Sequence, residues 1–338
     1  MTTERRSPVL LAVFAIFAAV LIALTARELL VLFGGFLFAL VLRRLSAKIS
    51  RLVHLPYPVC LAALLVAILA STAAMFVIAG PTLYEQLVAL AHRLPAALSD
   101  VVAAIRKAPF GRALAPPGPV TAGAVPQTWL SKAFSALGTS LEVVGAIVVI
   151  FFVGVYGAAR PSDYKRVLIA AFPCRQRRQV LRVANTVARN LTRWLLGRLV
   201  AMVFVGVSCG IAFAILDVPL ALILAVLAGL LTFVEYVGAV VSAIPPVVLA
   251  FTVRPTSALL VLVTFTVLHV IEGYVLTPLL ARATVRFPPA LTLAAQIVLA
   301  ALVGPLGLTF STPLCIVIVS AITTVRGTQQ TARARDRK

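Results

Sequence analysis

The chain has 338 residues, of which 62% are hydrophobic and only 12% charged, and its mean hydropathy is +1.08. A soluble domain carries about 25% charged residues, so this composition excludes a soluble globular protein. The formal charge of +20 does not indicate nucleic-acid binding, because the basic residues cluster at the ends of apolar stretches, where the positive-inside rule places them.

About ten apolar stretches of 14 to 23 residues run through the chain with almost no charge inside them. Crossing a hydrocarbon core about 30 Å thick takes about 20 helical residues, and in lipid the backbone must satisfy its own hydrogen bonds. The stretches therefore predict an all-α polytopic integral membrane protein. We expect about eight transmembrane helices, with ten as the alternative, and broken or re-entrant helices in the C-terminal half.

The first apolar stretch, Val9 to Thr25, follows Arg5 and Arg6. The apolar part of a signal peptide is usually shorter, about 7 to 15 residues, and a second apolar stretch, Leu29 to Leu42, follows at once. We therefore predict an uncleaved helical hairpin. The two arginines place the N-terminus in the cytoplasm, and the predicted basic turn at Arg43 to Arg51 agrees with this orientation.

A third span, Pro58 to Gly80, completes an N-terminal region of three transmembrane helices, residues 1–80. Residues 81–140 form the longest segment outside the apolar stretches on the far side of the membrane. Proline and glycine in residues 115–126 cannot continue a helix, so two amphipathic pieces are expected on either side of them. The fourth span, Leu141 to Ala159, returns to the cytoplasm.

Residues 160–198 carry ten basic residues and a single acid, Asp163, and are therefore expected in the cytoplasm. Apolar residues recur in this segment at helical spacing: Val180, Ala184, Val187, Leu191 and Leu195. Arginines fall largely on the other faces: Arg178, Arg182, Arg189 and Arg193. This pattern predicts an amphipathic helix lying in the membrane surface, with anionic lipid headgroups as its partner. A regulatory, calmodulin-type helix is the alternative.

The rest of residues 141–338 is a nearly continuous apolar region, interrupted by glycine and proline, which we expect to form the C-terminal core of one single membrane domain. Ala239 to Val253 and Ala290 to Val303 are short for a full crossing, which favours broken or re-entrant helices. Two glycines and a proline between Gly304 and Gly307 predict a tight reversal. The basic tail from Arg326 is expected in the cytoplasm. Together with the N-terminal arginines, this places both termini in the cytoplasm.

Three side chains stand out as candidates for transport or coupling: Glu235, His269 and Glu272. Both acids lie in apolar surroundings, and an acid within the membrane is costly and by default marks a pathway or a proton relay. His269 and Glu272 are three residues apart and share a helix face. The alternative is that each carboxyl group is protonated or hydrogen-bonded and only fixes helix packing.

No enzymatic motif is recognisable. The chain has no phosphate-binding loop of the form G-x-x-x-x-G-K-[ST] and no H-E-x-x-H, and its four cysteines form no C-x-x-C pair. We therefore expect no catalytic residue, no cofactor, no metal site and no disulfide framework.

The C-terminal half resembles the autoinducer-2 exporter family, a widespread group of bacterial permeases. The blocks that carry the resemblance are Leu230 to Gly238, Ile244-Pro245-Pro246, Ile271 to Pro278, Phe287 to Leu291, Gly304 to Leu308 and Thr312-Pro313. Their order and spacing match the family across roughly Arg193 to Thr323. Two departures concern the backbone and the charge: Glu235 stands where the family commonly has proline, and Asp217 where glycine is usual.

The resemblance implies a bacterial inner-membrane protein, without ATPase parts, that moves a small solute, a signal molecule or an ion. We expect a homo-oligomeric secondary transporter, with sodium (cation)/proton antiport and a non-transporting scaffold as alternatives. Five residues are expected to shape broken helices beside the acids: Gly238, Pro245, Pro278, Gly304 and Gly307.

Overall fold

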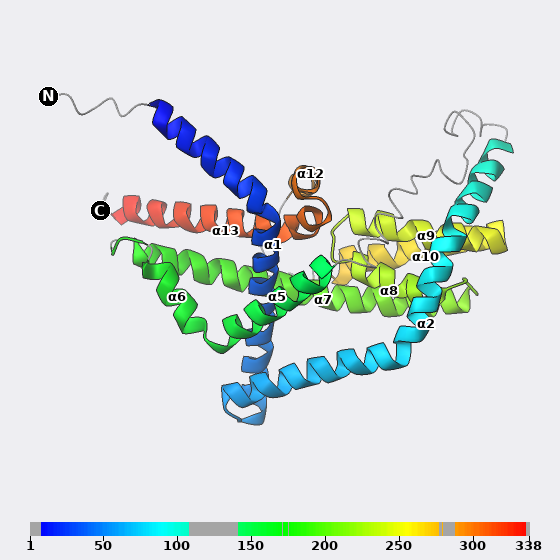
Figure 1. The fold of residues 1–338 in the computed structure, drawn as a ribbon, viewed down its shortest axis with the longest axis horizontal. Helices are drawn as coiled ribbons and strands as arrows, with labels where there is room; N and C mark the ends of the chain where they lie inside the picture. The colour runs from blue at the N-terminus through cyan, green and yellow to red at the C-terminus, as the bar shows by residue number, and fades with distance from the viewer. Residues whose placement is uncertain are drawn as a thin grey trace. The chain divides into compact units, whose positions relative to one another are not determined.

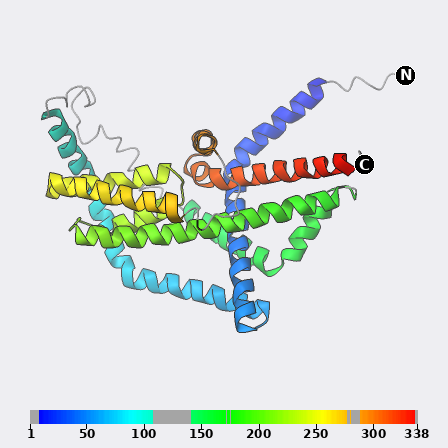
Figure 2. The ribbon, with the colours of Figure 1, turned by 180° about the vertical axis from the view of Figure 1, so that it is seen from behind.

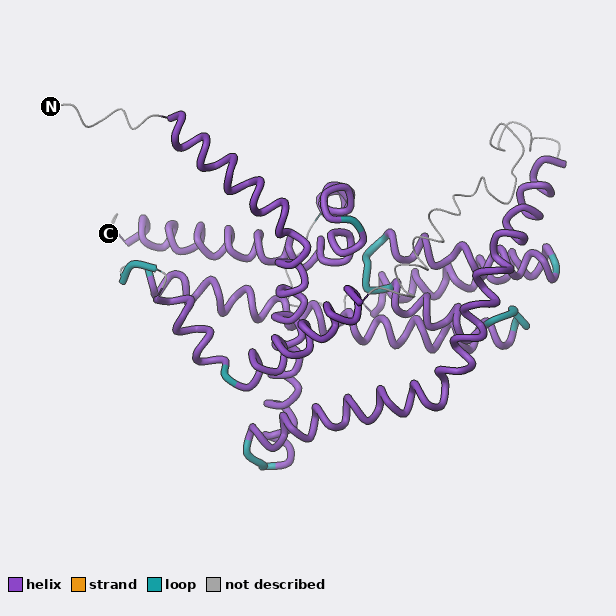
Figure 3. The backbone as a smooth tube through the Cα atoms, viewed as in Figure 1, coloured by secondary structure: helices purple, strands orange, loops and turns teal. Residues whose placement is uncertain are grey.

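The protein is described by a computed structural model that covers residues 8–107, 141–170, 172–174, 176–276, 279 and 288–335. Its elements are α1 (Pro8–Val53), α2 (Tyr57–Lys107), α5 (Leu141–Ala159), α6 (Pro161–Ala170), α7 (Arg177–Ile215), α8 (Ala221–Leu231), α9 (Val237–Val253), α10 (Pro255–Ile271), η1 (Glu272–Leu276), α12 (Pro289–Val303) and α13 (Pro305–Arg335) (Figure 1). Every regular element in these residues is helical (Figure 3).

Five helices contain apolar stretches long enough to cross a bilayer: Thr25–Val53, Tyr57–Lys107, Arg177–Ile215, Pro255–Leu276 and Pro305–Arg326. Shorter apolar helices are Val143–Ala159, Ala221–Leu231, Val237–Val253 and Pro289–Val303. Large apolar side chains on these helices are exposed, such as Ile78 at 80% and Ile215 at 75%. Lipid accommodates such a surface, whereas water does not. The chain is an all-α, multi-pass membrane protein, and the count of eight crossings stays a prediction.

The predicted N-terminal hairpin is wrong, because α1 is one helix of 46 residues that contains both apolar stretches. The residues between the stretches, Ala26 to Leu29, are strong helix formers, and neither glycine nor proline interrupts them. Arg43 and Arg44 therefore lie inside a helix rather than in a turn. The helix ends at Val53, and the two-crossing argument for the orientation of the N-terminus loses its basis.

The helix does not end with the predicted third span at Gly80, since α2 is one helix of 51 residues with Pro81 and Pro95 inside it. A proline within a helix removes one backbone hydrogen bond and bends the helix. Both views show α2 changing direction along its course (Figures 1 and 2). The first amphipathic piece is thus the second half of α2, and the predicted break at residues 115–126 lies outside the described residues.

The fourth span is confirmed as a helix with the predicted bounds, α5. The basic segment that follows forms α6 and the first half of α7. α7 runs on from this segment through Leu199 to Ile215 as one helix of 39 residues, so the basic segment and the apolar stretch after it share one helix. Leu195, Leu196 and Arg198 are good helix formers, and the single Gly197 among them costs only about 1 kcal/mol relative to alanine, which is too little to stop the helix.

Two compact units are formed, each from separate stretches of chain, and the second comprises Arg43–Gly145 and Thr192–Thr284. Its core joins side chains of α2, α7, α8, α9 and α10: Leu90, Leu94, Val205, Phe213, Leu224, Leu249, Val261 and Phe265. α9 and α10 pack side by side (Figures 1 and 2). The backbone N–H of Ile223, in the first turn of α8, donates to Gln86 Oε1 at 3.0 Å, which satisfies a donor that the helix itself leaves unpaired.

The first unit comprises Met1–Leu42, Ala146–Leu191 and Val285–Lys338. Small residues let α1 and α5 approach closely: a Cβ added to Gly35 would lie 2.7 Å from the side chain of Val153. Asn190 donates to the buried Ser320 hydroxyl at 3.0 Å, which joins α7 to α13. Close glycine packing and an interhelical hydrogen bond are the usual means by which helices associate in lipid.

The tight reversal predicted at Gly304 is confirmed. Gly304 ends α12 with φ 72° and ψ −148°, a conformation essentially restricted to glycine, and α13 begins at the next residue. A Cβ on Gly307 would collide with the carbonyl oxygen of Leu299, so α13 can fold back against α12 only with glycine there.

A second backbone feature explains one departure from the family pattern. Asp217, between α7 and α8, has φ 52°, which is the left-handed region where glycine is at ease. Aspartate tolerates this region better than most side chains. A glycine, which the resemblance leads one to expect at this position, would suit the same turn, and Asp217 replaces it at little cost.

Candidate functional site

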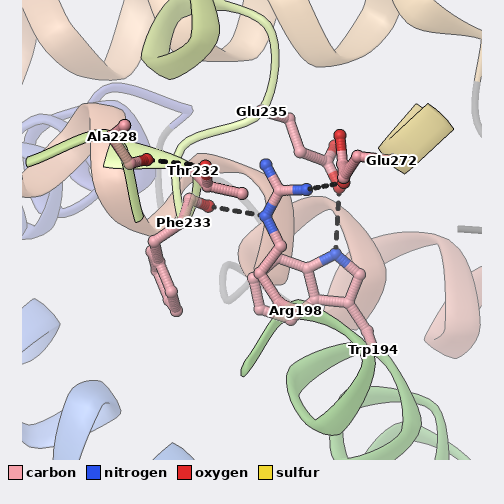
Figure 4. A network of polar contacts seen from close by, with 7 residues as sticks. All are labelled: Trp194, Arg198, Ala228, Thr232, Phe233, Glu235 and Glu272. Carbon is pink, nitrogen blue, oxygen red and sulfur yellow. Dashed lines mark hydrogen bonds and ion pairs between the residues drawn. The ribbon is translucent and has the colours of Figure 1, made fainter. Parts of the chain in front are cut away.

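The candidate site lies in the second unit and centres on two side chains of α7. Trp194 and Arg198 are four residues apart, so they lie on the same face of the helix. Arg198 Nη1 forms an ion pair with Glu272 Oε1 at 3.2 Å, and Arg198 Nε donates to the carbonyl oxygen of Phe233, also at 3.2 Å. Trp194 Nε1 donates to Glu235 Oε1 at 3.2 Å. Figure 4 shows both carboxylates pointing toward this pair.

Glu235 lies in the turn between α8 and α9, where the predicted break in the helix is confirmed. Tyr236 has φ 59° and ψ −63°, and the N–H of Val237 donates to the Glu235 carbonyl oxygen at 2.6 Å. These are the features of a γ-turn of the rare, strained kind. The helix therefore breaks here although Glu235 occupies the family's proline position. Strain of this sort is retained where the surrounding structure holds it, commonly at functional sites.

Gly238 closes the turn. A Cβ at this position would collide with the carbonyl oxygen of Leu231, the last residue of α8. Thr232, buried at the start of the turn, donates its hydroxyl to the Ala228 carbonyl oxygen at 2.7 Å (Figure 4). The end of α8 and the start of α9 are thus held together tightly, which fixes the backbone carbonyl of Phe233 that Arg198 binds.

Glu272 lies at the other side of Arg198 and is 9% exposed. It follows the last residue of α10 and begins a short π-helix, η1. In a π-helix each backbone hydrogen bond joins residues five apart instead of four, so the helix is locally wider. Single π-helical turns are rare and occur frequently at functional sites. Both predicted acids are therefore at breaks in regular α-helix, and Arg198 contacts elements at both breaks.

His269, the third predicted residue, lies one turn before Glu272 and is half-buried. Its ring stacks on Phe265 at a centroid distance of 4.2 Å, and Nδ1 lies 3.1 Å from the Phe265 carbonyl oxygen. Because a carbonyl oxygen only accepts, this contact places a proton on Nδ1. The buried Nε2 has no hydrogen-bond partner among the described residues, so the neutral ring keeps an acceptor available there.

The predicted helix-break residues divide into three outcomes. Gly238, Gly304 and Gly307 lie at breaks, as described. Pro245 lies inside α9, so the helix does not break there. Prolines are tolerated within membrane helices because neighbouring groups satisfy the freed carbonyl. Pro278 lies outside the described residues.

Sequence reasoning missed Trp194 and Arg198, which were read as part of a basic surface segment. Their partners are 41 and 74 residues away, so no local pattern pairs them. One signal was present: Arg198 directly precedes an uncharged apolar stretch. An arginine at that position, four residues after a tryptophan, could have been assigned to the inside of the helix bundle.

Comparison with known proteins decides the family. Residues 10–327 match the family described as AI-2E family transporter. The chain belongs to the AI-2E family. This extends the resemblance seen in the C-terminal blocks to nearly the whole chain.

Individual AI-2E relatives are distant. "Putative transport protein YueF" of Bacillus subtilis is 23% identical over 57% of this chain and 53% of its own length. "Putative transport protein YrrI" of the same organism is 27% identical over 37% of this chain and 35% of its own length. A "Putative transport protein" of Thermotoga maritima is 33% identical over 30% of this chain and 32% of its own length. The chain thus spans about half or less of the length of the curated relatives it matches.

Proposed function

We propose that this AI-2E family member is a secondary transporter that moves a small solute or signal molecule across a bacterial inner membrane. Membership of a family described as transporters supports transport. The chain shows no phosphate-binding loop, so the driving force is assigned to an ion or substrate gradient. The family's namesake substrate, autoinducer-2, is one member of the solute class to be tested.

The observation that carries this proposal is the Arg198–Glu272 ion pair, with Glu235 held beside it by Trp194. Ionised groups so far removed from water are costly and are retained where charge must be bound or moved. The formal charges of Arg198, Glu235 and Glu272 sum to −1 when both acids are ionised. The cluster can therefore take up one proton or one monovalent cation without exceeding neutrality.

The geometry suggests how uptake is coupled to movement. Neutralising Glu272 weakens its attraction to Arg198 Nη1, while Arg198 Nε still holds the Phe233 carbonyl. The end of α10 is then released from the strained α8–α9 turn. We infer two alternative arrangements of these elements, each of which exposes the site to a different side of the membrane. Protonation of Glu272 would shift the populations of the two arrangements.

Sodium (cation)/proton exchange is a second candidate, favoured by the two carboxyl groups that gather at Arg198 and Trp194. His269, with an acceptor nitrogen buried one turn from Glu272, would relay the proton in this case. The solute would then be an inorganic cation rather than an organic molecule. Cytoplasmic placement of both termini is kept as part of either proposal.

Flux measurements on the purified, reconstituted chain separate these candidates. Proteoliposomes with an imposed pH gradient are tested for uptake of a panel of neutral hydroxylated solutes, autoinducer-2 included. In parallel, internal pH is followed while sodium is added outside. Solute uptake that depends on the gradient supports the first proposal, and sodium-driven proton movement supports the second. No flux in either assay contradicts both and leaves the scaffold alternative.

A further inference from the structure

The turn between α1 and α2, residues 54–56, is held by both helices that it joins. Ser50 Oγ, in the last turn of α1, donates to the Leu55 carbonyl oxygen at 2.7 Å, and Cys60 Sγ, in the first turn of α2, donates to the same oxygen at 3.8 Å. His54 has φ 57°, a conformation that histidine adopts more often than most side chains. The end of α1, from Arg43, and the start of α2 are therefore fixed relative to each other within the second unit.

Three exposed basic side chains line one face of α1 just before this turn. Arg44, Lys48 and Arg51 are four and three residues apart, so they fall within a sector of about 60° around the helix axis. Ser46, about half a turn away around the axis, is 0% exposed. The buried side of the helix thus turns these three residues, called the basic face below, away from the interior of the unit.

No acidic residue of α1 or α2 lies close enough to neutralise the basic face. The sequence contains neither aspartate nor glutamate between Glu28 and Glu85. At 1.5 Å per residue along the helices, Glu28 is about 24 Å from Arg44, and Glu85 is about 42 Å from Tyr57 at the start of α2. The basic face therefore keeps its positive charge along both helices that meet at the turn.

Large apolar side chains are exposed directly beside the basic face. Leu52 is 79%, Val53 53% and Leu55 47% exposed, at the end of α1 and in the turn. Exposed apolar groups next to arginine and lysine are typical of segments that enter the boundary between lipid headgroups and acyl chains. A free anion would contact only the charged groups, whereas a phospholipid contacts the apolar groups as well.

The apolar part of α2 places this region at the edge of the bilayer. Pro58 to Gly80 begins just after the turn and is about 34 Å long as a helix, which matches a hydrocarbon core about 30 Å thick. Its large side chains, such as Val66 and Phe76, are exposed and so face lipid. α2 leaves the end of α1 in a new direction instead of running back along it (Figures 1 and 2). The last turns of α1 are therefore at the level of the headgroups.

We propose that Arg44, Lys48 and Arg51 bind the phosphate of an anionic phospholipid, whose acyl chains contact Leu52 and Leu55. Arginine matches phosphate because its planar guanidinium donates two parallel hydrogen bonds, and lysine adds a compact charge. Clusters of basic residues directly beside a membrane span attract anionic lipids. Such binding holds the α1–α2 turn at the membrane surface, and it does not depend on which solute the protein moves.

The test uses the full-length protein, purified in a neutral detergent and titrated with phosphatidylglycerol or phosphatidylcholine. Bound lipid is counted by native mass spectrometry, and the parent protein should bind phosphatidylglycerol more tightly. R44Q/K48Q/R51Q should lower the affinity for phosphatidylglycerol about tenfold or more, because each basic residue near the membrane surface adds to the attraction. R44K/R51K should keep most of the affinity, since the charge is unchanged.

R93Q/R106Q/K107Q is the matched control. It removes three basic side chains from the second half of α2, in the same unit, where Glu85 and Asp100 are close in sequence. It should change the affinity less than twofold. Equal losses in the two triple variants would overturn the proposal, as would a parent protein without preference for phosphatidylglycerol.

A further variant separates a lipid from a free anion. L52S/L55S keeps every charge and replaces two exposed side chains, so the fold should be unaffected. It should lower the affinity for phosphatidylglycerol about threefold or more, because apolar contact with the acyl chains is lost. Unchanged affinity in L52S/L55S, or displacement of the lipid by millimolar inorganic phosphate, would show a simple anion site and overturn the proposal. Unchanged size-exclusion profiles verify that each variant is folded.

Discussion

Arg198 and Glu272 form an ion pair at 3.2 Å, with both side chains 11% exposed, and they join α7 to the α10–η1 junction across 74 residues of sequence. Removing one partner of a buried ion pair is strongly destabilising because the other partner stays buried without it, whereas removing both partners costs less. E272Q should therefore destabilise the protein by about 3 kcal/mol. R198Q/E272Q should destabilise it by less than the two single variants combined. Thermal unfolding in detergent across the four proteins measures this coupling, and additive effects would show that the pair contributes no interaction of its own.

Gly238→Ala should disturb the site more than the fold. The new Cβ would meet the Leu231 carbonyl oxygen, so the α8–α9 turn must open and carry Glu235 away from Trp194. We expect substrate flux to fall by at least tenfold while most of the protein remains monodisperse. Gly206→Ala is the control, because a Cβ there makes only ordinary contacts, the nearest at 3.5 Å. Parental flux in Gly238→Ala would refute the role of the turn.

Gly304→Ala should destabilise the α12–α13 reversal, because alanine rarely adopts φ 72° with ψ −148°. The expected loss is about 1–3 kcal/mol. Gly145 in α5 provides the comparison: a Cβ there has nothing within 4 Å. Gly145→Ala should be neutral or stabilising by up to about 1 kcal/mol, since alanine is the better helix former. Unfolding midpoints of the two variants should therefore move apart, and a common shift would contradict the argument from backbone conformation.

Trp194→Phe removes the N–H that donates to Glu235 but keeps an aromatic ring against Phe233. Loss of one hydrogen bond to a charged group costs about 1.5–3 kcal/mol. If Trp194 positions Glu235 for coupling, flux driven by a pH gradient should fall several-fold. Facilitated flux down a substrate gradient should fall less. Equal reduction of both fluxes would assign Trp194 a structural role only.

The fold class was readable from the sequence because apolar stretches of membrane-crossing length admit only helices. Positions with a stop signal were also predicted: α5 has the predicted bounds, and Gly304 reverses the chain where glycine and proline coincide. Failures occurred where such a signal is absent or is too weak to stop the helix. α1 and α7 continue through charged residues that are themselves good helix formers, and α2 continues through single prolines.

The candidate site was readable only in part, for a related reason. Glu235 and Glu272 stood out because a charge in apolar surroundings is costly. Arg198 did not, since it ends a run of arginines that look alike in sequence. Arg198 differs in its angular position around the helix axis. It lies on the buried side of α7, whereas Arg193 lies on the exposed side. That assignment needs the partners of the helix, which one sequence does not provide.

Coupling through Glu272 is tested by comparing two glutamate substitutions in reconstituted protein. Glu272 is buried against Arg198, whereas Glu85 on α2 is exposed, and both substitutions remove one carboxylate. Flux driven by a pH gradient is measured for E272Q and E85Q at equal protein content. E272Q should abolish gradient-driven flux, whereas E85Q should keep the parental rate. Parental flux in folded E272Q would contradict the claim that this carboxyl group couples transport.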